Sequence, residues 1–511
     1  MLSRIFSMGL FGMDAFPVEV ETDLSRGLPA FDIVGLPDAA VRESRDRVRA
    51  ALKNCGFDFP VSRITVNLAP ADQKKTGPIY DLPIFLSLLS ASGQLAARLP
   101  ERSIFLGELS LSGKLRPMRG VLPMAAQAKE NGFEAIYVPA ENASEGSVID
   151  GLKVYPISDV TSLLAHLQGK CELLPASPCP VSFPSGLFNA DFSDVRGLDD
   201  VKRAVEIAAC GGHNLLMIGP PGSGKSMIAK RIPSILPDMT REEQLEATKV
   251  HSIAGTIPTG CSLLPARPFR APHHTISPAG LSGGGTIPKP GEISLAHNGV
   301  LFLDEFPEFS RGTTELLRQP IEDGIVSISR ASGRAVYPCS VMLVAAMNPC
   351  PCGFFGHPTK PCTCTPAAVS KYLSRISGPM LDRFDLHIEV SAVEFEVFDT
   401  AAPAESSSEI RKRVNAAREI QTKRFKGTTI SCNARITPDL LQEFCPMHAK
   451  ARTIFQKAFE AFGFSARTYD RVLKVARTIA DMDESPQIEA PHAAEAVQYR
   501  ALDRKYWEHA H

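Results

Sequence analysis

The sequence predicts an α/β protein in which helices cover the strands and the chain ends in a helical part. Two apolar runs, 215–218 and 300–303, are continuous in the way expected of strands buried on both faces. Before residue 168, β-rich runs alternate with helical stretches, as in an α/β domain. After residue 408 the apolar residues recur at helical spacing, most clearly over 469–482.

The first domain is predicted to span residues 1–168. We expect strands at 18–21, 64–68 and 135–138, and helices at 38–54 and 82–92. The helix at 38–54 carries four arginines: Arg42, Arg45, Arg47 and Arg49. The mildly apolar start, 1–20, contains Asp14 and Pro17 and is followed by no small-residue cleavage site, so we interpret it as a first strand rather than a signal peptide.

The rest of the chain divides into three segments. Residues 169–185 are rich in proline and show little periodicity, which predicts a linker. Residues 186–396 form the predicted α/β core, and residues 397–511 form the predicted helical lid, with a break at 402–408.

Composition limits the possible classes of protein. The 511 residues suggest two to four domains. The formal net charge is -1, so binding to nucleic acid would have to come from local basic patches. The sequence has no run of roughly 20 apolar residues, the length that a membrane helix needs. We therefore expect a cytoplasmic protein without a membrane partner, whose twelve cysteines are mostly reduced.

A glycine-rich loop with a lysine and a hydroxyl follows the strand at 215–218. In such a loop, backbone N–H groups turn inward around phosphate oxygens, and the next helix presents its positive N-terminus. Lys225 would reach the β- and γ-phosphates of ATP, and Ser226 would bind Mg²⁺. The predicted nucleotide-binding residues are Gly219, Pro220, Pro221, Gly222, Ser223, Gly224, Lys225, Ser226 and Met227.

Two later apolar strands end in the polar groups that hydrolysis needs. Asp304 would hold Mg²⁺ through water, and Glu305 would polarise the attacking water. Asn348, at the end of the strand 341–347, would orient that water, although asparagine at a strand end is also a common turn residue.

Three arginines are candidates for contacts to the γ-phosphate. An arginine from a neighbouring subunit can stabilise the charge that develops there. Arg383 is our first choice for this role and Arg375 the second; the alternative is a structural pair with Asp382 or Asp385. Arg467, at the start of the last long helix, fits a lid arginine that senses nucleotide, or else a solvated helix start.

Four cysteines gather on one short loop rich in glycine and proline. Cys350, Cys352, Cys362 and Cys364 supply the four thiolates that a tetrahedral structural zinc ion takes. The Cys-x-Cys pairs are tighter than the usual spacing, so reduced free thiols and a redox switch remain alternatives.

Four stretches of the sequence resemble the ComM/YifB family, within the magnesium-chelatase-like branch of AAA+ proteins. They are residues 26–38 (RGLPAFDIVGLPD), 267–277 (RPFRAPHHTIS), 348–353 (NPCPCG) and 476–481 (ARTIAD). The resemblance covers essentially the whole chain. It implies a homo-hexameric ring that moves on single-stranded and branched DNA, promotes branch migration during natural transformation, and works beside recombination proteins. It also implies ATP and Mg²⁺ as ligands.

The first domain resembles the proteolytic domain of Lon. In Lon the nucleophilic serine follows a Gly-Pro pair, but here Ile79 follows Gly77-Pro78, and the stretch 119–124 that matches the region of the Lon lysine has no lysine. A Ser–Lys dyad needs both partners. We therefore expect a scaffold or DNA-contact module rather than a protease.

The resemblance also indicates where DNA would bind. Residues 325–336 are predicted to form a hairpin with Arg330 and Arg334 near its tip, and in related ring helicases this hairpin projects into the pore. The stretch 267–285 adds Arg267 and Arg270, together with His273 and His274, which we expect on opposite sides of a strand. The alternative function is a chelatase-type motor or chaperone that remodels a protein partner.

Overall fold

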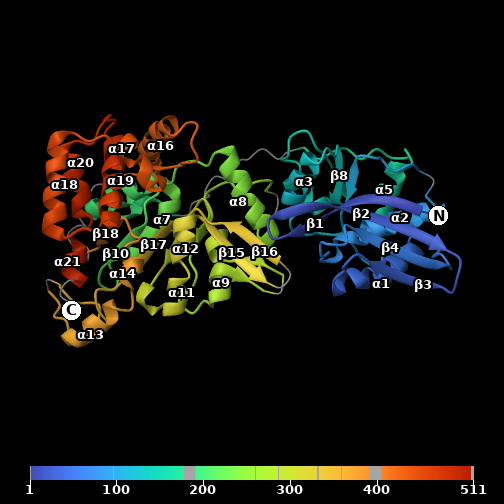
Figure 1. Ribbon diagram of the computed structural model, residues 1–511, viewed down its shortest axis with the longest axis horizontal. Helices are drawn as coiled ribbons and strands as arrows, with labels where there is room; N and C mark the ends of the chain where they lie inside the picture. The colour runs from blue at the N-terminus through green and yellow to red at the C-terminus, as the bar shows by residue number, and fades with distance from the viewer. Residues whose placement is uncertain are drawn as a thin grey trace.

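The computed structural model describes residues 2–95, 97–177, 190–258, 261–285, 287–330, 333–357, 359–391 and 404–507. Figure 1 shows an elongated molecule: residues 2–177 form a first lobe at one end, and the α/β core and the C-terminal helices form the other. Within the described residues, no helix is long and apolar enough to cross a membrane.

The first lobe is built on a seven-stranded mixed sheet with the order β3-β4-β2-β1-β5-β8-β9. Residues 1–20 do not form the single strand that we expected. They turn at Gly12, whose φ is 62°, so that β1 and β2 pair as an antiparallel hairpin. The strands are β1 (Leu2–Phe11), β2 (Asp14–Ser25), β3 (Ala30–Val34), β4 (Arg63–Ala69), β5 (Ser103–Phe105), β8 (Ala135–Pro139) and β9 (Lys153–Ile157); β6 (Glu108–Leu109) and β7 (Leu115–Arg116) form a separate small pair.

The helices predicted in this lobe are confirmed. Asp38 accepts a hydrogen bond from the backbone N–H of Val41 and so caps the first helix, as aspartate commonly does. Of its arginines, Arg47 is structural, because it pairs with the buried Asp81 at 2.7 Å. The helices are α1 (Ala39–Asn54), α2 (Asp81–Ala91), α3 (Val121–Glu130), α4 (Ala143–Gly146) and α5 (Val160–Leu167).

The core contains a five-stranded sheet with the order β11-β14-β17-β10-β18, whose neighbouring strands all run parallel. The strands are β10 (Leu215–Ile218), β11 (Phe269–Arg270), β14 (Val300–Leu303), β17 (Met342–Met347) and β18 (Leu386–Glu389). Both faces carry buried apolar residues, which accounts for the continuous apolar runs in the sequence. Because the strands are parallel, the loops that follow them gather at one edge of the sheet.

Helices and two small hairpins surround this sheet. The predicted hairpin at 325–336 is confirmed as β15 (Ile325–Arg330) and β16 (Gly333–Pro338), and β12 (Gly283–Gly284) pairs with β13 (Lys289–Pro290). The helices are α6 (Asp199–Gly211), α7 (Lys225–Ile235), α8 (Arg241–Ala254), α9 (Pro278–Ser282), α10 (Glu292–Leu295), α11 (Arg311–Glu315), α12 (Arg318–Asp323), α13 (Pro366–Leu373) and α14 (Gly378–Leu381).

The last part of the chain is helical, as expected. Helix α19, with its buried apolar side chains, packs in one cluster with α6 and one face of the core sheet. The helices are α16 (Ser407–Arg424), α17 (Leu441–Phe444), α18 (Ala449–Phe462), α19 (Ala466–Met482), α20 (Ala490–Gln498) and α21 (Leu502–Trp507). Of the break predicted at 402–408, residues 402–403 lie outside the described residues and Ser407 already begins α16; the predicted linker 169–185 is described only to residue 177.

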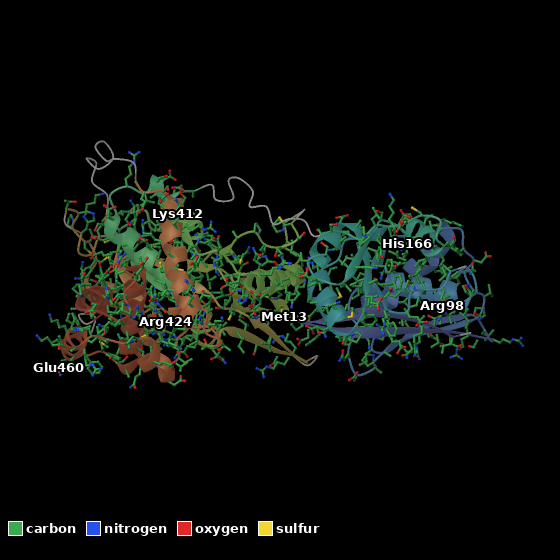
Figure 2. All side chains as sticks on the ribbon, turned by 90° about the horizontal axis from the view of Figure 1, so that it is seen from above. Met13, Arg98, His166, Lys412, Arg424 and Glu460 are labelled. Atoms are coloured by element: carbon green, nitrogen blue, oxygen red, sulfur yellow. The ribbon has the colours of Figure 1, made fainter. Side chains whose placement is uncertain are left out.

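The first lobe contacts the core in two places. At the first, α3 packs against α8, and the backbone N–H of Gly120 donates to the carbonyl of Ser252 at 3.1 Å. At the second, Leu10, Phe11 and Met13 pack against the apolar cluster that includes the β15–β16 hairpin. Figure 2 shows Met13 where the two parts meet.

The first contact buries a carboxyl group and should make stability depend on pH. Burial raises the pKa of Glu145 to about 7, although a hydrogen bond from the side-chain amide of Asn142 opposes the shift. A carboxyl whose pKa is higher in the folded state favours folding when protonated, so stability should fall as pH rises from about 4.5 to about 7. Glu145→Gln should remove up to ~3 kcal/mol of this dependence, measured as a melting-temperature difference between pH 5.5 and 8. An unchanged difference in the variant would contradict the assignment.

Candidate functional site

The glycine-rich loop joins β10 to α7 at the edge of the sheet where the parallel strands end. Gly222 and Gly224 have φ values of 79° and 90°, which let the loop curl before the helix begins at Lys225. Gly219 leaves no room for a side chain, because a Cβ there would lie 2.2 Å from the carbonyl oxygen of Val390. Ser223 is buried, and Met227 is 36% exposed beside the loop. The loop thus has the form that surrounds phosphate groups.

Lys225 is folded back into this loop. Its Nζ donates to the carbonyl oxygens of Gly219 and Pro220, both at 2.8 Å, and lies 3.3 Å from Oδ1 of Asn348. Burial lowers its pKa to about 8, while the nearby Asp304 opposes the shift. The ammonium group is therefore in position to exchange carbonyl partners for phosphate oxygens.

The two predicted Mg²⁺ ligands lie together. Ser226 donates through Oγ to Oδ2 of Asp304 at 2.5 Å, although the two residues are far apart in the sequence. The pairing of β10 with β17, and of β17 with β14, aligns the strand ends that carry them. A hydroxyl and a carboxylate are oxygen donors of the kind that Mg²⁺ takes, so the pair fits the ion.

Glu305 follows Asp304 in an unusual backbone conformation. Its φ is 50°, a left-handed value that is uncommon for a residue other than glycine, and its side chain is 61% exposed. The backbone N–H of Glu305 donates to Oδ1 of Asp304 at 2.9 Å. The carboxylate thus stands at the open edge where water can enter.

Arg383 and Arg375 occupy different environments. Arg383 is only 4% exposed and pairs with Glu322 at 2.6 Å. It lies just before β18, at the amino-terminal end of the parallel strands, whereas the phosphate loop follows the carboxyl end of β10. Arg375 is 50% exposed and pairs with Glu308 at 2.8 Å. Neither of these ion pairs involves Asp382 or Asp385, the alternative partners that the sequence suggested.

Arg467 does not reach the phosphate loop of its own chain. Arg467 lines a cavity of about 370 Å³ together with Asn214, which directly precedes β10. Arg467 therefore lies near the amino-terminal end of β10, whereas the phosphate loop follows the carboxyl end of that strand. The predicted role of Arg467 as a lid arginine that senses nucleotide therefore stays a prediction, and within one chain the residue lies away from the phosphate loop. The same cavity is lined by three further basic residues that were not predicted from the sequence: Arg435, Arg471 and Lys474.

Of the four predicted DNA contacts, two are exposed and two are held by acids. Arg330 and Arg334 are exposed on the β15–β16 hairpin. Arg270 is clamped by both carboxylate oxygens of Glu292, at 2.5 and 2.7 Å. Arg267 was misjudged as a DNA contact: its side chain is 12% exposed and binds Glu243 and the carbonyls of Pro237 and Asn298, which gives it a structural role.

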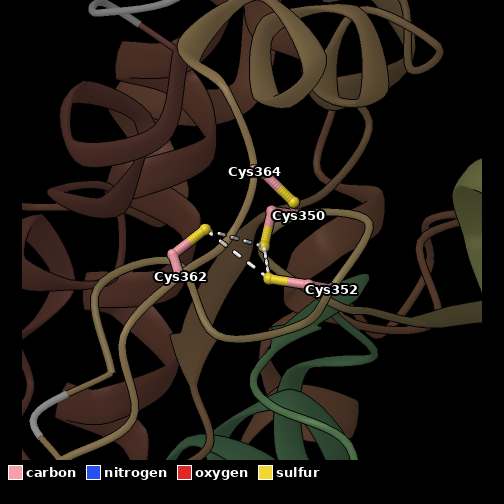
Figure 3. A group of neighbouring side chains, drawn as sticks. All are labelled: Cys350, Cys352, Cys362 and Cys364. Atoms are coloured by element: carbon pink, nitrogen blue, oxygen red, sulfur yellow. Dashed lines mark hydrogen bonds between the residues drawn. The ribbon is translucent and has the colours of Figure 1, made fainter.

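The four cysteines converge on one point (Figure 3). Their sulfur atoms all lie within 4.8 Å of one another, and Cys350, Cys352 and Cys362 are separated by 3.3 to 3.7 Å. Tetrahedral zinc with Zn–S bonds of about 2.3 Å separates its sulfurs by ~3.8 Å, so the cluster is compatible with a structural zinc ion. Backbone N–H groups of Phe354 and Thr363 lower the pKa of Cys352 to about 5, which favours the thiolate.

The cysteine loop packs against the phosphate loop. Gly353 approaches Pro221 so closely that a Cβ at Gly353 would lie 2.4 Å from Cδ of the proline. The cysteine loop therefore supports one side of the candidate nucleotide site.

The histidine pair differs from the expectation. The rings of His273 and His274 do not point to opposite sides of a strand; they lie beyond β11 with centroids 4.1 Å apart. His274 Nδ1 is 3.3 Å from Oε2 of Glu305. This contact was not predicted from the sequence, because it depends on the pairing of β11 with β14.

This geometry and the comparisons with known proteins define an AAA+ ATPase of the magnesium-chelatase type, a class that binds ATP and Mg²⁺. Three family models match in succession: "Subunit ChlI of Mg-chelatase" at residues 20–142, "Magnesium chelatase, subunit ChlI" at 191–398, and "Magnesium chelatase, subunit ChlI C-terminal" at 404–500.

The chain belongs to the ComM/YifB family. It is 44% identical to the YifB protein of Escherichia coli over 98% of both chains, and 43% identical to competence protein ComM of Haemophilus influenzae over 98% of both chains. A weaker similarity, 24% identity to Lon protease of Mycolicibacterium smegmatis, covers 31% of this chain and 21% of the protease. It agrees with a Lon-like α/β fold for the first lobe.

Proposed function

We propose that this chain is a hexameric, ATP-driven DNA translocase that promotes branch migration when incoming DNA recombines during natural transformation. The proposal is supported by the full-length similarity to a competence protein, combined with a candidate ATP site in which Ser226 and Asp304 lie together. We also propose a cytoplasmic location, because incoming DNA recombines there and cysteines stay reduced in that compartment.

In the proposed reaction, the phosphate loop and Lys225 bind the triphosphate. Ser226 and Asp304 would hold Mg²⁺, which would neutralise charge on the phosphate oxygens. Glu305 polarises the attacking water, and Asn348, adjacent to Lys225, orients it.

A ring explains why some candidate arginines lie away from their own phosphate loop. Arg383 and Arg467 stand near the opposite edge of the core sheet from the loop, so a neighbouring copy can receive them at its nucleotide. We assign Arg383 the role of stabilising charge on the neighbour's γ-phosphate, and Arg467 a supporting contact to the same nucleotide. Six copies would close the ring.

DNA would meet the β15–β16 hairpin in the pore. Exposed Arg330 and Arg334 contact phosphates rather than bases, so we propose binding that is independent of sequence and sensitive to salt. Arg270 remains available only if it leaves Glu292, and we no longer propose Arg267.

The test is a double variant, Arg330→Ala with Arg334→Ala. Each lost phosphate contact should lower the slope of log affinity against log salt by about 0.7 on single strands. We expect weaker binding to forked and four-way DNA at moderate salt, loss of DNA-stimulated hydrolysis and branch migration, and unchanged ATP affinity. The control is Arg196→Ala, at an exposed arginine remote in sequence from the hairpin. Unchanged DNA affinity in the double variant would contradict the assignment of the hairpin.

We propose that Cys350, Cys352, Cys362 and Cys364 hold one structural zinc ion per chain. Elemental analysis of purified protein should find about one zinc per chain, and Cys352→Ser with Cys362→Ser should abolish it. Cys171→Ser, at an exposed cysteine outside the cluster, serves as the control. Well under one zinc in the unaltered protein would exclude the site and leave free thiols or a redox switch.

A second candidate function is a chelatase-type motor that remodels a protein partner. The three chelatase family models favour it. An ATPase that ignores DNA but responds to a protein partner would support this function and contradict the translocase.

A further inference from the structure

Arg383, the arginine that we assign to the neighbour's γ-phosphate, is held inside its own chain. Its guanidinium pairs with Glu322 at 2.6 Å and donates to the carbonyl of Pro379, also at 2.6 Å, and only 4% of the side chain is exposed. An arginine that stabilises a γ-phosphate must present its N–H groups to that phosphate. The ion pair with Glu322 therefore competes with the proposed role of Arg383.

The surroundings of Arg383 make Glu322 its main electrostatic support. Burial lowers the pKa of Arg383, and Glu322 opposes this shift. Three nearby cations lower the pKa further: Arg318, Arg471 and Arg467. Among the described residues, Nε of Arg383 has no hydrogen-bond partner. Because a buried charge with incomplete partners is costly, the guanidinium would favour a position outside the chain if Glu322 were withdrawn.

The backbone of Arg383 is fixed to the core sheet and to the C-terminal helices. Its carbonyl oxygen accepts a hydrogen bond from Nδ2 of Asn214, just before β10, at 2.8 Å. The same oxygen accepts from Nη1 of Arg471, on α19, at 3.0 Å. The guanidinium can therefore change its partner while the backbone of Arg383 stays in place.

Glu322 belongs instead to the part of the core that carries the candidate DNA hairpin. It lies on α12, and β15 follows this helix after a single residue, Gly324. Cys339, directly after β16, donates through its backbone N–H to the carbonyl of Gly324 at 2.8 Å and through Sγ to the carbonyl of Pro320 at 3.3 Å. Figure 1 shows the helix beside the hairpin. A displacement of the hairpin would therefore move Glu322 relative to Arg383.

We propose that Glu322 is a positioning residue that keeps Arg383 inside its own chain until DNA binds. DNA at the β15–β16 hairpin draws α12 away, the ion pair opens, and the guanidinium reaches the γ-phosphate held by the neighbouring copy. The inference rests on the proposed ring-shaped translocase and identifies what regulates its trans-acting arginine. For this regulation to work, DNA must bind the open arrangement more tightly than the closed one.

The first test compares the steady-state ATPase of the full-length chain with that of Glu322→Gln, each with and without forked DNA. Glutamine keeps a hydrogen-bond acceptor for Arg383 but removes the negative charge that retains it. We expect DNA-free kcat to rise roughly 5-fold, a size typical of coupling between two sites. KM for ATP should stay unchanged, and the ratio of DNA-stimulated to DNA-free rate should approach one.

The matched control is Asp323→Asn. Asp323 is the next residue on α12, it is exposed, and it accepts a hydrogen bond from Gln319 of the same helix at 3.0 Å. Its replacement removes the same charge at almost the same place without touching Arg383, so the original ratio should be kept.

The second test asks in which chain Glu322 acts. When Lys225→Ala subunits are mixed with Arg383→Ala subunits, an active interface must combine the lysine of the second with the arginine of the first. Adding Glu322→Gln to the Lys225→Ala subunit should raise the DNA-free rate of the mixed rings. The same change in the Arg383→Ala subunit, which has no arginine to release, should give no such rise. A merely structural role of Glu322 would not produce this asymmetry.

Several outcomes would overturn the inference. An unchanged ratio in Glu322→Gln, or an equal loss of activity with and without DNA, would show that Glu322 has only a structural role. If the glutamine variant is unstable, Glu322→Asp takes its place, because it keeps the charge on a shorter side chain. It should give a smaller rise in the DNA-free rate, and no rise would contradict the inference.

Failure of the proposed function would look different. If the unaltered protein hydrolyses ATP without any response to DNA, the translocase function fails and the inference fails with it. If DNA stimulates hydrolysis but the mixture of Lys225→Ala and Arg383→Ala stays inactive, the trans-acting role of Arg383 fails, and so does the role of Glu322. Stimulation by DNA that persists undiminished in Glu322→Gln contradicts the inference alone.

Discussion

Lys225→Ala is expected to lower ATP hydrolysis by at least ~10²-fold, the size associated with loss of one well-placed charge stabiliser. The lysine stands at the helix N-terminus among carbonyl oxygens that it can exchange for phosphates. Without it, the loop retains its backbone N–H groups but loses the positive charge that reaches the β- and γ-phosphates.

The measurement is ATPase rate together with equilibrium binding of a fluorescent ATP analogue. The matched control is Lys230→Ala, because Lys230 lies on the same helix α7 with its side chain exposed. Its rate should equal that of the unaltered protein. Retained hydrolysis in Lys225→Ala would remove the basis for locating the triphosphate in this loop.

Arg383→Ala should reduce kcat by about 10³-fold or more, the effect of losing an arginine supplied to a neighbour's γ-phosphate. A low rate alone is ambiguous, because Arg383 also pairs with Glu322 and donates to the carbonyl of Pro379. Its loss could disturb the fold locally. A mixing experiment separates the two explanations.

Subunits of Arg383→Ala and Lys225→Ala, each inactive alone, should regain activity when they are mixed and allowed to form rings. At some interfaces an intact Lys225 on one chain would then meet an intact Arg383 on its neighbour. If the arginine served its own chain, no subunit in the mixture would hold both residues, and the rate would stay at background. The same mixture made with Arg375→Ala distinguishes the two candidates, since Arg375 is half exposed and forms its ion pair with the surface residue Glu308.

The parts of the site that depend on local sequence were predicted well. The strand before the phosphate loop, the strand before Asp304 and the hairpin at 325–336 all form as the sequence indicates. Parallel pairing of the strands then brings Ser226 into hydrogen-bond contact with Asp304. The order of the two motifs in the sequence was enough to predict that these residues lie together.

The failures involve contacts between distant segments. Arg267 looked like a free cation, but the carboxylate that buries it comes from α8, and no sequence pattern marks that pairing. The position of Arg467 depends on how α19 packs against α6 and the sheet. Likewise, His274 comes near Glu305 only because β11 pairs with the neighbouring strand β14. Each of these required tertiary packing, which periodicity does not encode.

The contact between the first lobe and the β15–β16 hairpin has a mechanical consequence. A side chain at Gly333 would come within 3.0 Å of the ring of Phe11, so the aromatic ring seats directly on the hairpin near its turn. If the hairpin moves during the proposed translocation, it must either carry the lobe along or separate from it, and separation would expose apolar surface at a cost in free energy. In the proposed translocation cycle, the lobe would therefore act as a load on the hairpin, and the strength of this contact would limit how far the hairpin could move alone.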